Sequence, residues 1–212
     1  MMVRIEPDDS AYPAVLREHL NGDALSCLYA LGDAAILKHC LLGLICSVQC
    51  PGSIILKTLD AVRLLRDAGV AVAGGFHSPM ERECLHLLLR GRAPVLYCAA
   101  RGLAGLRLGL AAREAVKAGR LLALSPFDEE VKRITGDRAR RRNEIVAALS
   151  REILIPHAVS GGKVWALAVN LLEEGRRVFT FDDAENADLI GAGATAVVTE
   201  ALIQEIVPGA FP

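Results

Sequence analysis

A run of basic residues is the feature of this sequence best suited to chemistry. The stretch Ser125–Ser150 holds six cationic side chains, namely Lys132, Arg133, Arg138, Arg140, Arg141 and Arg142. After Asn143 the apolar residues recur at helical spacing, so the basic segment leads into an amphipathic helix. At a helix start the free backbone N–H groups and the helix dipole add to side-chain charge, which makes this segment a candidate phosphate site. A solvated basic face is the alternative interpretation.

Two small-residue turns are further candidates for holding an anion. Gly74 and Gly75 let the backbone approach a ligand closely, and Ser78 with Glu81 fits a capping box at the start of a helix. The second turn combines small residues, a lysine and a helix start in Ser160, Gly161, Gly162 and Lys163. Neither turn has the spacing of a dinucleotide fingerprint or of a Walker A loop. The sequence therefore predicts anion contacts here without a nucleotide motif.

Other kinds of chemistry find little support. The residue spacing indicates no Ser-His-Asp or Cys-His arrangement, and it implies no catalytic residue, metal or cofactor. The six cysteines fit neither a zinc ribbon nor a Cys-x-x-Cys pair, namely Cys27, Cys40, Cys46, Cys50, Cys84 and Cys98. They are expected to be free thiols in a reducing cytoplasm, because no signal peptide is recognised. No apolar run is long enough for a membrane span, so no membrane partner is expected.

Charge is unevenly distributed along the chain. The 212 residues carry 24 Lys and Arg against 25 Asp and Glu, for a net charge of −1. Residues 101–151, however, hold 12 basic and 6 acidic side chains, a local charge of +6. This asymmetry permits a basic patch on a nearly neutral protein, whereas the net charge argues against general binding to polyanions. Aromatic residues are only 4% of the chain, so stacking surfaces for bases are scarce.

Short apolar runs alternate with helical patterns from residue 41 onward. The predicted strands are Leu41–Val48, Val70–Ala73, Pro94–Ala99, Leu121–Leu124, Ile153–Val159, Val178–Phe181 and Ala196–Val198. The predicted helices are Ser53–Ala68, Pro79–Arg90, Gly105–Ala118, Asp128–Ser150, Gly162–Glu174 and Glu200–Ile206. Continuously apolar strands, each followed by a helix, predict an α/β fold with a doubly wound, mostly parallel, Rossmann-like sheet covered by helices on both faces. Residues 1–40 are interpreted as an N-terminal cap, and residues 41–212 as one compact Rossmann-like domain.

Several segments occur in the order seen in one known family. They are Tyr12-Pro13, Leu28–Asp33, Gly74-Gly75, Arg142-Asn143 with Ile145–Ser150, Ser160–Gly162, Gly175-Arg176 with Val178-Phe179, and Asn186 with Leu189-Ile190 and Gly193-Ala194. In these segments the chain resembles the DNA-processing protein A (DprA/Smf) family, from about Tyr12 to about Ala194. The most specific segment, from Arg142 to Ser150, resembles the family's R-N-R-x-I-x-x-L-S.

The resemblance implies a function and a site. The family's Rossmann-like domain binds single-stranded DNA, forms homodimers and loads RecA recombinase in natural transformation and recombination, without catalysis. By resemblance, Arg142 and Asn143 lie in the DNA or phosphate pocket, which is lined by Gly74, Gly75 and Ser160–Gly162.

The chain also departs from the family pattern. Where the family has Gly-Ser-Arg after the first strand of the core, this chain has Cys46-Ser47-Val48. The second arginine of R-N-R is Glu144, and Ser78–Cys84 replaces the family's G-I-D-x-x-A-H. Two positive charges are lost and one negative charge is gained. We therefore expect a divergent, stand-alone member with weaker or altered DNA binding, in which Arg138, Arg140 and Arg141 compensate.

Two other hypotheses remain open from the sequence. A small-nucleotide-binding protein or nucleotide hydrolase on a related scaffold would use the two small-residue turns, with Glu81 or Glu83 as acid or base. A structural protein would use its apolar surplus for an oligomer interface.

Overall fold

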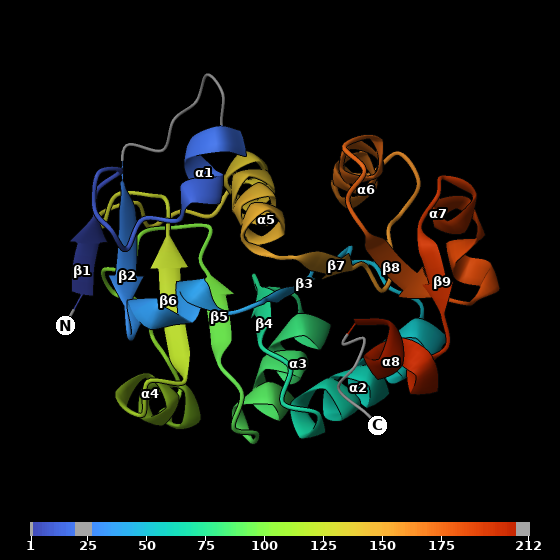
Figure 1. Cartoon of the computed structure of the whole chain (residues 1–212), viewed down its shortest axis with the longest axis horizontal. Helices are drawn as coiled ribbons and strands as arrows, with labels where there is room; N and C mark the ends of the chain where they lie inside the picture. The colour runs from blue at the N-terminus through green and yellow to red at the C-terminus, as the bar shows by residue number, and fades with distance from the viewer. Residues whose placement is uncertain (1, 20–26, 207–212) are drawn as a thin grey trace.

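The computed structural model describes residues 2–19 and 27–206, and within these ranges nine strands form one sheet (Figure 1). Their order across the sheet is β1-β2-β6-β5-β4-β3-β7-β8-β9. The strands are β1 (Met2–Ile5), β2 (Leu28–Leu31), β3 (Leu42–Leu44), β4 (Val72–Gly74), β5 (Val95–Cys98), β6 (Leu121–Ser125), β7 (Glu152–Leu154), β8 (Val178–Phe181) and β9 (Thr195–Val197). The seven strands from β3 to β9 pair in parallel, as the predicted βα alternation requires.

Helices cover both faces of the sheet. They are α1 (Ala14–His19), α2 (Gly52–Asp67), α3 (Pro79–Leu89), α4 (Leu110–Lys117), α5 (Gly136–Leu149), α6 (Lys163–Glu173), α7 (Ala187–Gly191) and α8 (Leu202–Ile206), with short 3₁₀ helices η1 (Ala34–Lys38), η2 (Ala184–Asn186) and η3 (Thr199–Ala201). Figure 1 shows α2, α3, α4 and α8 on one face, and α1, α5, α6 and α7 on the other. The predicted doubly wound α/β fold is confirmed.

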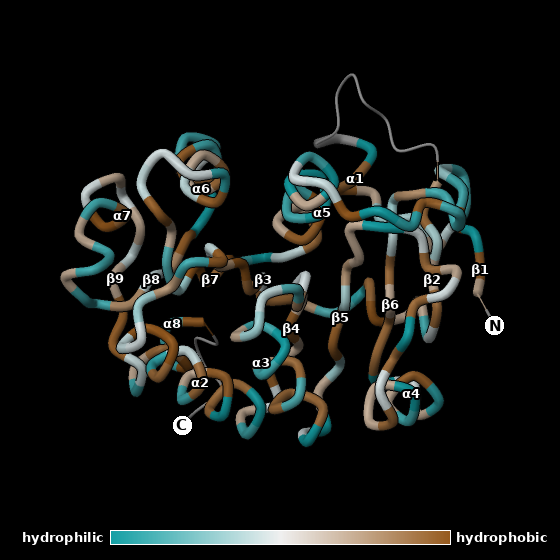
Figure 2. Tube along the Cα trace, turned by 180° about the vertical axis from the view of Figure 1, so that it is seen from behind, coloured by the Kyte–Doolittle hydropathy of each residue, from teal (hydrophilic) through white to brown (hydrophobic). Residues whose placement is uncertain are grey.

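Most of the core lies in two hydrophobic clusters, one on each face of the sheet, and a smaller third cluster includes Tyr29 and Leu103. One cluster joins strand residues to Ile145 and Val146 of α5 and to Leu171 of α6. The other joins the opposite face to Val62 of α2 and Leu87 of α3. Figure 2 shows hydrophobic residues along β6, with polar residues on the outer side of α5. Burial on both faces explains why the strands appear in the sequence as continuous apolar runs.

The N-terminal segment extends the sheet. β2 pairs antiparallel with β6, and β1 pairs antiparallel with β2. The sequence predicted an extended piece at Leu28–Leu31 but no strand at Met2–Ile5. Leu28 and Ile36 are buried in the same cluster as α5, so β2 and η1 contribute to the core of the parallel strands. The boundary at residue 40 stays a prediction of domain organisation, and residues 207–212 lie outside the described chain.

Several predicted elements begin or end elsewhere. The helix predicted over Asp128–Ser150 is shorter, because Thr135 caps α5 by accepting a hydrogen bond from the N–H of Arg138 at 3.3 Å. Residues 128–135 are therefore irregular. The helix predicted from Gly105 begins at Leu110, since Gly105 has a φ of +75°, outside the right-handed helical region.

The first and fifth predicted strands are also shorter than expected. Leu41–Val48 is reduced to Leu42–Leu44, and Ile153–Val159 to Glu152–Leu154. The parallel strands β3 and β7 are neighbours, but the chain continues from them toward opposite ends of the sheet. β3 leads through α2 to β4 on one side, whereas β7 leads through α6 to β8 on the other. The residues beyond each strand leave the ladder there and form the loops of a topological switch point, where ligands bind in open α/β sheets.

Candidate nucleic-acid interface

Four neighbouring parallel strands end at one edge of the sheet and carry most of the candidate site. In the order β5, β4, β3 and β7, the segments that follow them are residues 99–109, 75–78, 45–51 and 155–162. Helix α5 packs on the sheet face behind this edge, because its apolar side contacts β3, β4 and β5. The helix follows β6, so its N-terminus lies at the carboxyl edge of the strands. The basic segment and the glycine turn are thereby brought together.

Among the predicted site residues, Arg142 is a buried arginine without a partner in the described part of the chain. Its side chain is on the buried side of α5 and is only 5% exposed. Among the described residues it forms no hydrogen bond or ion pair, and its Nε atom is buried without an acceptor. A buried guanidinium normally finds a carboxylate or carbonyl partner, because an unpaired buried charge is strongly unfavourable. An anion supplied from outside the chain would be that partner.

The glycine turn after β4 makes room for Arg142. A Cβ atom on Gly75 would overlap the guanidinium group, so only glycine lets the arginine lie against the backbone here. The next residue, Phe76, is buried with a φ of +44°, an uncommon conformation for a bulky residue. Its ring packs against Gly74, where an added Cβ would lie 2.9 Å from the ring edge. The turn is thus a strained, close-packed segment, as is common at ligand sites.

Tyr97 in β5 and Arg101 just after it lie near the glycine turn and Arg142, and the sequence analysis did not identify either residue. Tyr97 is paired with Gly74 across β4 and β5, and its ring lies 6.3 Å from that of Phe76. Burial raises the pKa of Tyr97, and the positive charges of Arg142 and Arg101 oppose that rise. Arg101 is therefore a second cation near this edge. Both residues could have been found by asking what ends and follows each predicted strand.

The other arginines of the basic segment are engaged differently. Arg140 and Arg141 both pair with Glu144, at 3.1 and 3.4 Å. Glu144, which replaces the second arginine of the family pattern, thus forms ion pairs with two arginines. Arg138 donates a hydrogen bond to the carbonyl of Arg133 at 2.7 Å. The side chain of Asn143 is half-buried and forms no hydrogen bond with the described residues.

The turn after β7 leads into a helix start without a side-chain cap. Gly162 is the N-cap of α6 and makes no side-chain capping bond, while Gly161 has a φ of +72°. Lys163 reaches back to the start of α5, where its Nζ lies 3.8 Å from Asp137 and against Gly136. Ser160, Gly161 and Lys163 are exposed. The N–H of Gly162 donates to the carbonyl of Val159 at 2.9 Å, so the exposed residues Ser160 and Gly161, together with the lysine, are the candidates for an anion contact at this helix start.

The helix start after β4 is already occupied by the chain itself. The hydroxyl of Ser78 accepts a hydrogen bond from the N–H of Glu81 at 3.2 Å, and the Glu81 carboxylate accepts from the N–H groups of Ser78 and His77 at 2.9 and 3.1 Å. Both side chains are buried. The predicted capping box is confirmed, whereas a direct role of Ser78 in anion binding stays a prediction. Glu83 is exposed and lies 3.4 Å from the ring of His86. Neither glutamate is positioned as a free acid or base.

The loops at the switch point are tied together by a polar network. The N–H of Ser47 donates to the carbonyl of His157 at 3.0 Å, and the N–H of Val159 donates to the Ser47 hydroxyl at 3.1 Å. Asn186 donates to the carbonyls of Pro156 and Phe181, so its Oδ1 accepts from the Nδ1–H of His157 at 3.0 Å. The network holds the β3 and β7 loops in fixed positions at the mouth of the site.

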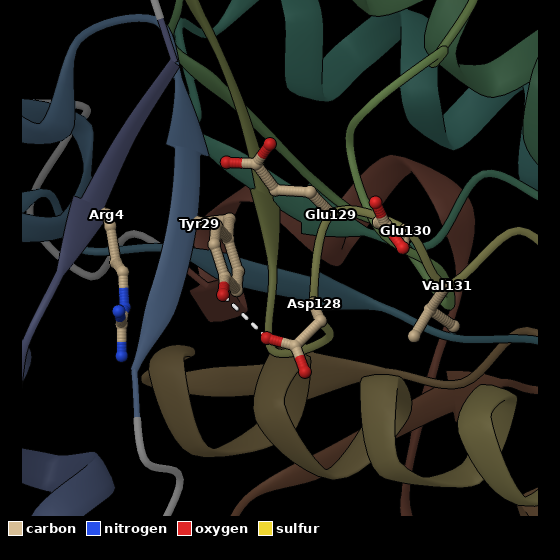
Figure 3. Close-up of a pocket in the computed structure, with 6 residues that line it drawn as sticks. All are labelled: Arg4, Tyr29, Asp128, Glu129, Glu130 and Val131. Carbon is tan, nitrogen blue, oxygen red and sulfur yellow. Dashed lines mark hydrogen bonds between the residues drawn. The ribbon is translucent and has the colours of Figure 1, made fainter.

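A separate pocket of about 610 Å³ lies near the antiparallel end of the sheet (Figure 3). Arg4, Tyr29 and Val131 line it together with the carboxylates of Asp128, Glu129 and Glu130. Tyr29 donates a hydrogen bond of 2.6 Å to Asp128, which raises the pKa of the phenol. Three carboxylates against one arginine make this pocket unsuited to a polyanion.

Two further kinds of feature are absent from residues 2–19 and 27–206. No group of three His, Cys, Asp or Glu side chains could hold a metal ion there. Among the helices of these ranges, none is long and apolar enough to cross a membrane.

The fold of this chain is similar to that of two solved structures of DNA processing protein A. No curated protein matches the chain. DNA processing protein A from Streptococcus pneumoniae superposes with a TM-score of 0.79 at 18% identity, covering 96% of this chain and 74% of that one. DNA processing protein A from Helicobacter pylori, whose structure concerns a mode of single-stranded DNA binding, has a TM-score of 0.68 at 17% identity, with 100% and 92% coverage.

The fold is also shared, more distantly, with a cofactor-binding protein, and one family model matches the sequence. A molybdenum cofactor binding protein from Rippkaea orientalis has a TM-score of 0.53 at 14% identity, with 78% and 94% coverage. At such low identities the superpositions show a shared fold. The sequence model of one family, DNA recombination-mediator protein A, matches residues 4–207. Because this match spans nearly the whole chain, the protein belongs to the DNA recombination-mediator protein A family.

Proposed function

We propose that this protein binds single-stranded DNA at the carboxyl edge of β5, β4, β3 and β7, and that it acts in DNA processing without catalysing a reaction. One observation carries the proposal. Arg142 is buried against Gly75 with no partner among the described residues, at the edge where ligands of this fold bind. Family membership supports it, and so does the Helicobacter pylori relative, whose structure concerns single-stranded DNA.

The DNA backbone would be held at two places. One phosphate would meet the guanidinium of Arg142, with Arg101 adding positive charge near Tyr97. Another would be received by the N–H groups of Ser160 and Gly161 and by Lys163 at the start of α6. Phosphate contacts of this kind position a strand without reading its sequence, so binding should be sequence-independent and sensitive to salt.

Fluorescence anisotropy of a labelled single-stranded oligonucleotide across a salt series tests the proposal. We expect affinity to fall with salt at a slope of about −0.7 per neutralised phosphate, and Arg142→Ala to weaken binding and flatten that slope. Arg113→Ala is the matched control, because Arg113 is exposed on α4 at the opposite face of the sheet. The proposal would be overturned by an absence of binding at low salt or by an affinity that does not change across the salt series. It would also be overturned if Arg142→Ala and Arg113→Ala lost the same amount of affinity.

A small-nucleotide ligand is the second candidate. It is favoured by the uncapped start of α6, which could receive a single phosphate group. Glu81 and Glu83 offer no free carboxylate for hydrolysis, so this candidate is a binding protein. Thermal stabilisation by nucleotides in a chain that fails to bind oligonucleotides would support it.

Assembly and location rest on the resemblance to the family. We propose that the chain forms a homodimer, that RecA recombinase is its protein partner, and that both act in the cytoplasm. Analytical ultracentrifugation tests the first statement, and a binding assay with purified RecA tests the second.

A further inference from the structure

The turn after β4 holds buried backbone donors that have no acceptor. Gly75 and Phe76 are both buried, and their N–H groups donate to no acceptor among the described residues. The next two N–H groups, those of His77 and Ser78, are satisfied by the carboxylate of Glu81. Buried N–H groups without a partner are rare, because each costs the free energy of a lost hydrogen bond. The first two residues of the turn thus offer donors to a group from outside the chain.

The guanidinium of Arg142 lies against the same turn and is open at one end. Its Nε, its Cζ and one terminal nitrogen are the atoms that a Cβ on Gly75 would meet. Nε is fully buried without an acceptor. The two terminal nitrogens also have no partner among the described residues, but they are not fully buried. Because the whole residue is only 5% exposed, the opening that reaches them is narrow.

Positive charge is uncompensated around this opening. Arg101 lies near it as well, since the charges of Arg101 and Arg142 both oppose the rise in the pKa of Tyr97. The nearby carboxylates are engaged elsewhere, because Glu81 accepts from backbone N–H groups and Glu144 pairs with two other arginines. No carboxylate of the described residues pairs with Arg142. A small ligand with a high negative charge would balance these groups.

A phosphate inside a strand and a phosphate at its end differ in shape and in charge. An internal phosphodiester has a nucleoside on both sides, two free oxygens and a single negative charge. A terminal phosphate has a nucleoside on one side only, three free oxygens and a charge of about −1.5 to −2 at pH 7. The narrow opening favours the group with one substituent, and the unpartnered donors favour the group with more oxygens. The exposed Lys163, in contrast, is accessible to any phosphate along a strand.

We propose that Arg142 and the turn at Gly75 and Phe76 form a subsite for a phosphate monoester, and that this monoester is the terminal phosphate of a DNA strand. The assignment rests on the proposed function and makes it more specific, because the strand is held at its end here and along its length by Lys163. A strand that ends in hydroxyls still reaches the opening with an internal phosphate, but it leaves donors unpaired. A free nucleoside monophosphate carries the same chemical group, so the experiment includes both sources.

Fluorescence anisotropy of three otherwise identical oligonucleotides measures the preference. Each carries its label on an internal base, and the ends bear a 5′-phosphate, a 3′-phosphate or hydroxyls only. We expect at least one phosphorylated strand to bind about tenfold more tightly than the hydroxyl strand, because its third oxygen permits a further hydrogen bond to a charged group. Equal affinities of the three strands would overturn the assignment and leave the proposed function intact. Binding of none of them would overturn both.

Variants separate the subsite from a general attraction between charges. Arg142→Lys keeps the positive charge but loses the planar guanidinium, so the difference between the strands should be lost. Lys163→Ala should weaken all three strands by a similar factor and preserve the difference, and Arg113→Ala should change neither. A difference that persists in Arg142→Lys would overturn the assignment.

Competition in the unmutated protein identifies the source of the monoester without depending on the folding of a variant. The competitors are the unlabelled phosphorylated strand and thymidine monophosphate with its phosphate at the same position. We expect the strand to displace the probe at a lower concentration, because only the strand also contacts Lys163. Equal competition by the two would assign the subsite to a free nucleotide and would overturn the assignment to a strand end.

Discussion

Replacing Arg142 by methionine should make the protein more stable and a poorer DNA binder. Methionine keeps an unbranched apolar stem in the space that the arginine stem fills, and it removes the guanidinium. In the free protein Arg142 is 5% exposed, and its buried Nε lacks an acceptor. The substitution therefore removes an unfavourable burial without breaking a hydrogen bond or ion pair among the described residues.

The size of the effect follows from the unsatisfied donor. A buried donor without a partner costs about 1–3 kcal/mol, so the free energy of unfolding should rise by about that amount. For a domain of this size each kcal/mol shifts the melting temperature by about 2–4 °C. Hydrogen bonds to a charged group contribute about 1.5–3 kcal/mol. Loss of one such contact should therefore weaken single-stranded DNA binding by about tenfold to a hundredfold.

Urea unfolding and oligonucleotide anisotropy on the same preparations measure the two effects. Arg113→Met is the control, because an exposed substitution should change the free energy of unfolding by less than about 0.5 kcal/mol. The reasoning is refuted if Arg142→Met destabilises the fold by more than about 1 kcal/mol. The arginine would then be a structural residue, and its lack of a partner would not indicate a ligand.

Three further substitutions have defined outcomes. Glu144→Gln removes the carboxylate that pairs with two arginines, so oligonucleotide binding should tighten and the salt slope should steepen by about 0.7 for each phosphate gained; an unchanged slope would contradict this. Gly75→Ala should displace the buried guanidinium and weaken binding without changing charge, whereas Gly191→Ala, where a Cβ meets nothing within 4 Å, should have no effect. The hydrogen bond from Lys57 lowers the pKa of Asp183, so its contribution to stability is present above about pH 4 and is lost as the pH falls through the lowered pKa. Asp183→Asn should therefore reduce stability at pH 7 and make acid unfolding less steep, as circular dichroism would detect.

The fold could be predicted because burial on both faces leaves a clear pattern. Leu121–Leu124 and Val178–Phe181 were predicted within one residue of the observed strands, since a fully buried parallel strand is a short apolar run bounded by turns. Met2–Ile5 was missed because it is an edge strand of only four residues, in which Ile5 alone is buried. The strand forms by pairing with β2, and the local sequence does not specify that pairing.

The candidate site was harder to predict, because Arg142 differs from the neighbouring arginines only in being buried. The four arginines of α5 have the same chemistry, and only their angle around the helix differs. Arg142 lies three and four residues before Ile145 and Val146, which places it on the apolar face of the helix. That spacing was present in the sequence and could have distinguished it from Arg140. The contact with Gly75 depends on tertiary packing and leaves no local signal.

The charges that remain at the site argue for weak binding with few phosphate contacts. Val48 is exposed where the family pattern has an arginine, and Glu144 neutralises part of the basic segment. What persists is Arg142, Arg101 and Lys163, each near a different part of the carboxyl edge. Each cation can neutralise about one phosphate, so three contacts predict a salt slope near −2 for a single strand. A much steeper slope would require cations from beyond this edge and would place the interface elsewhere on the molecule.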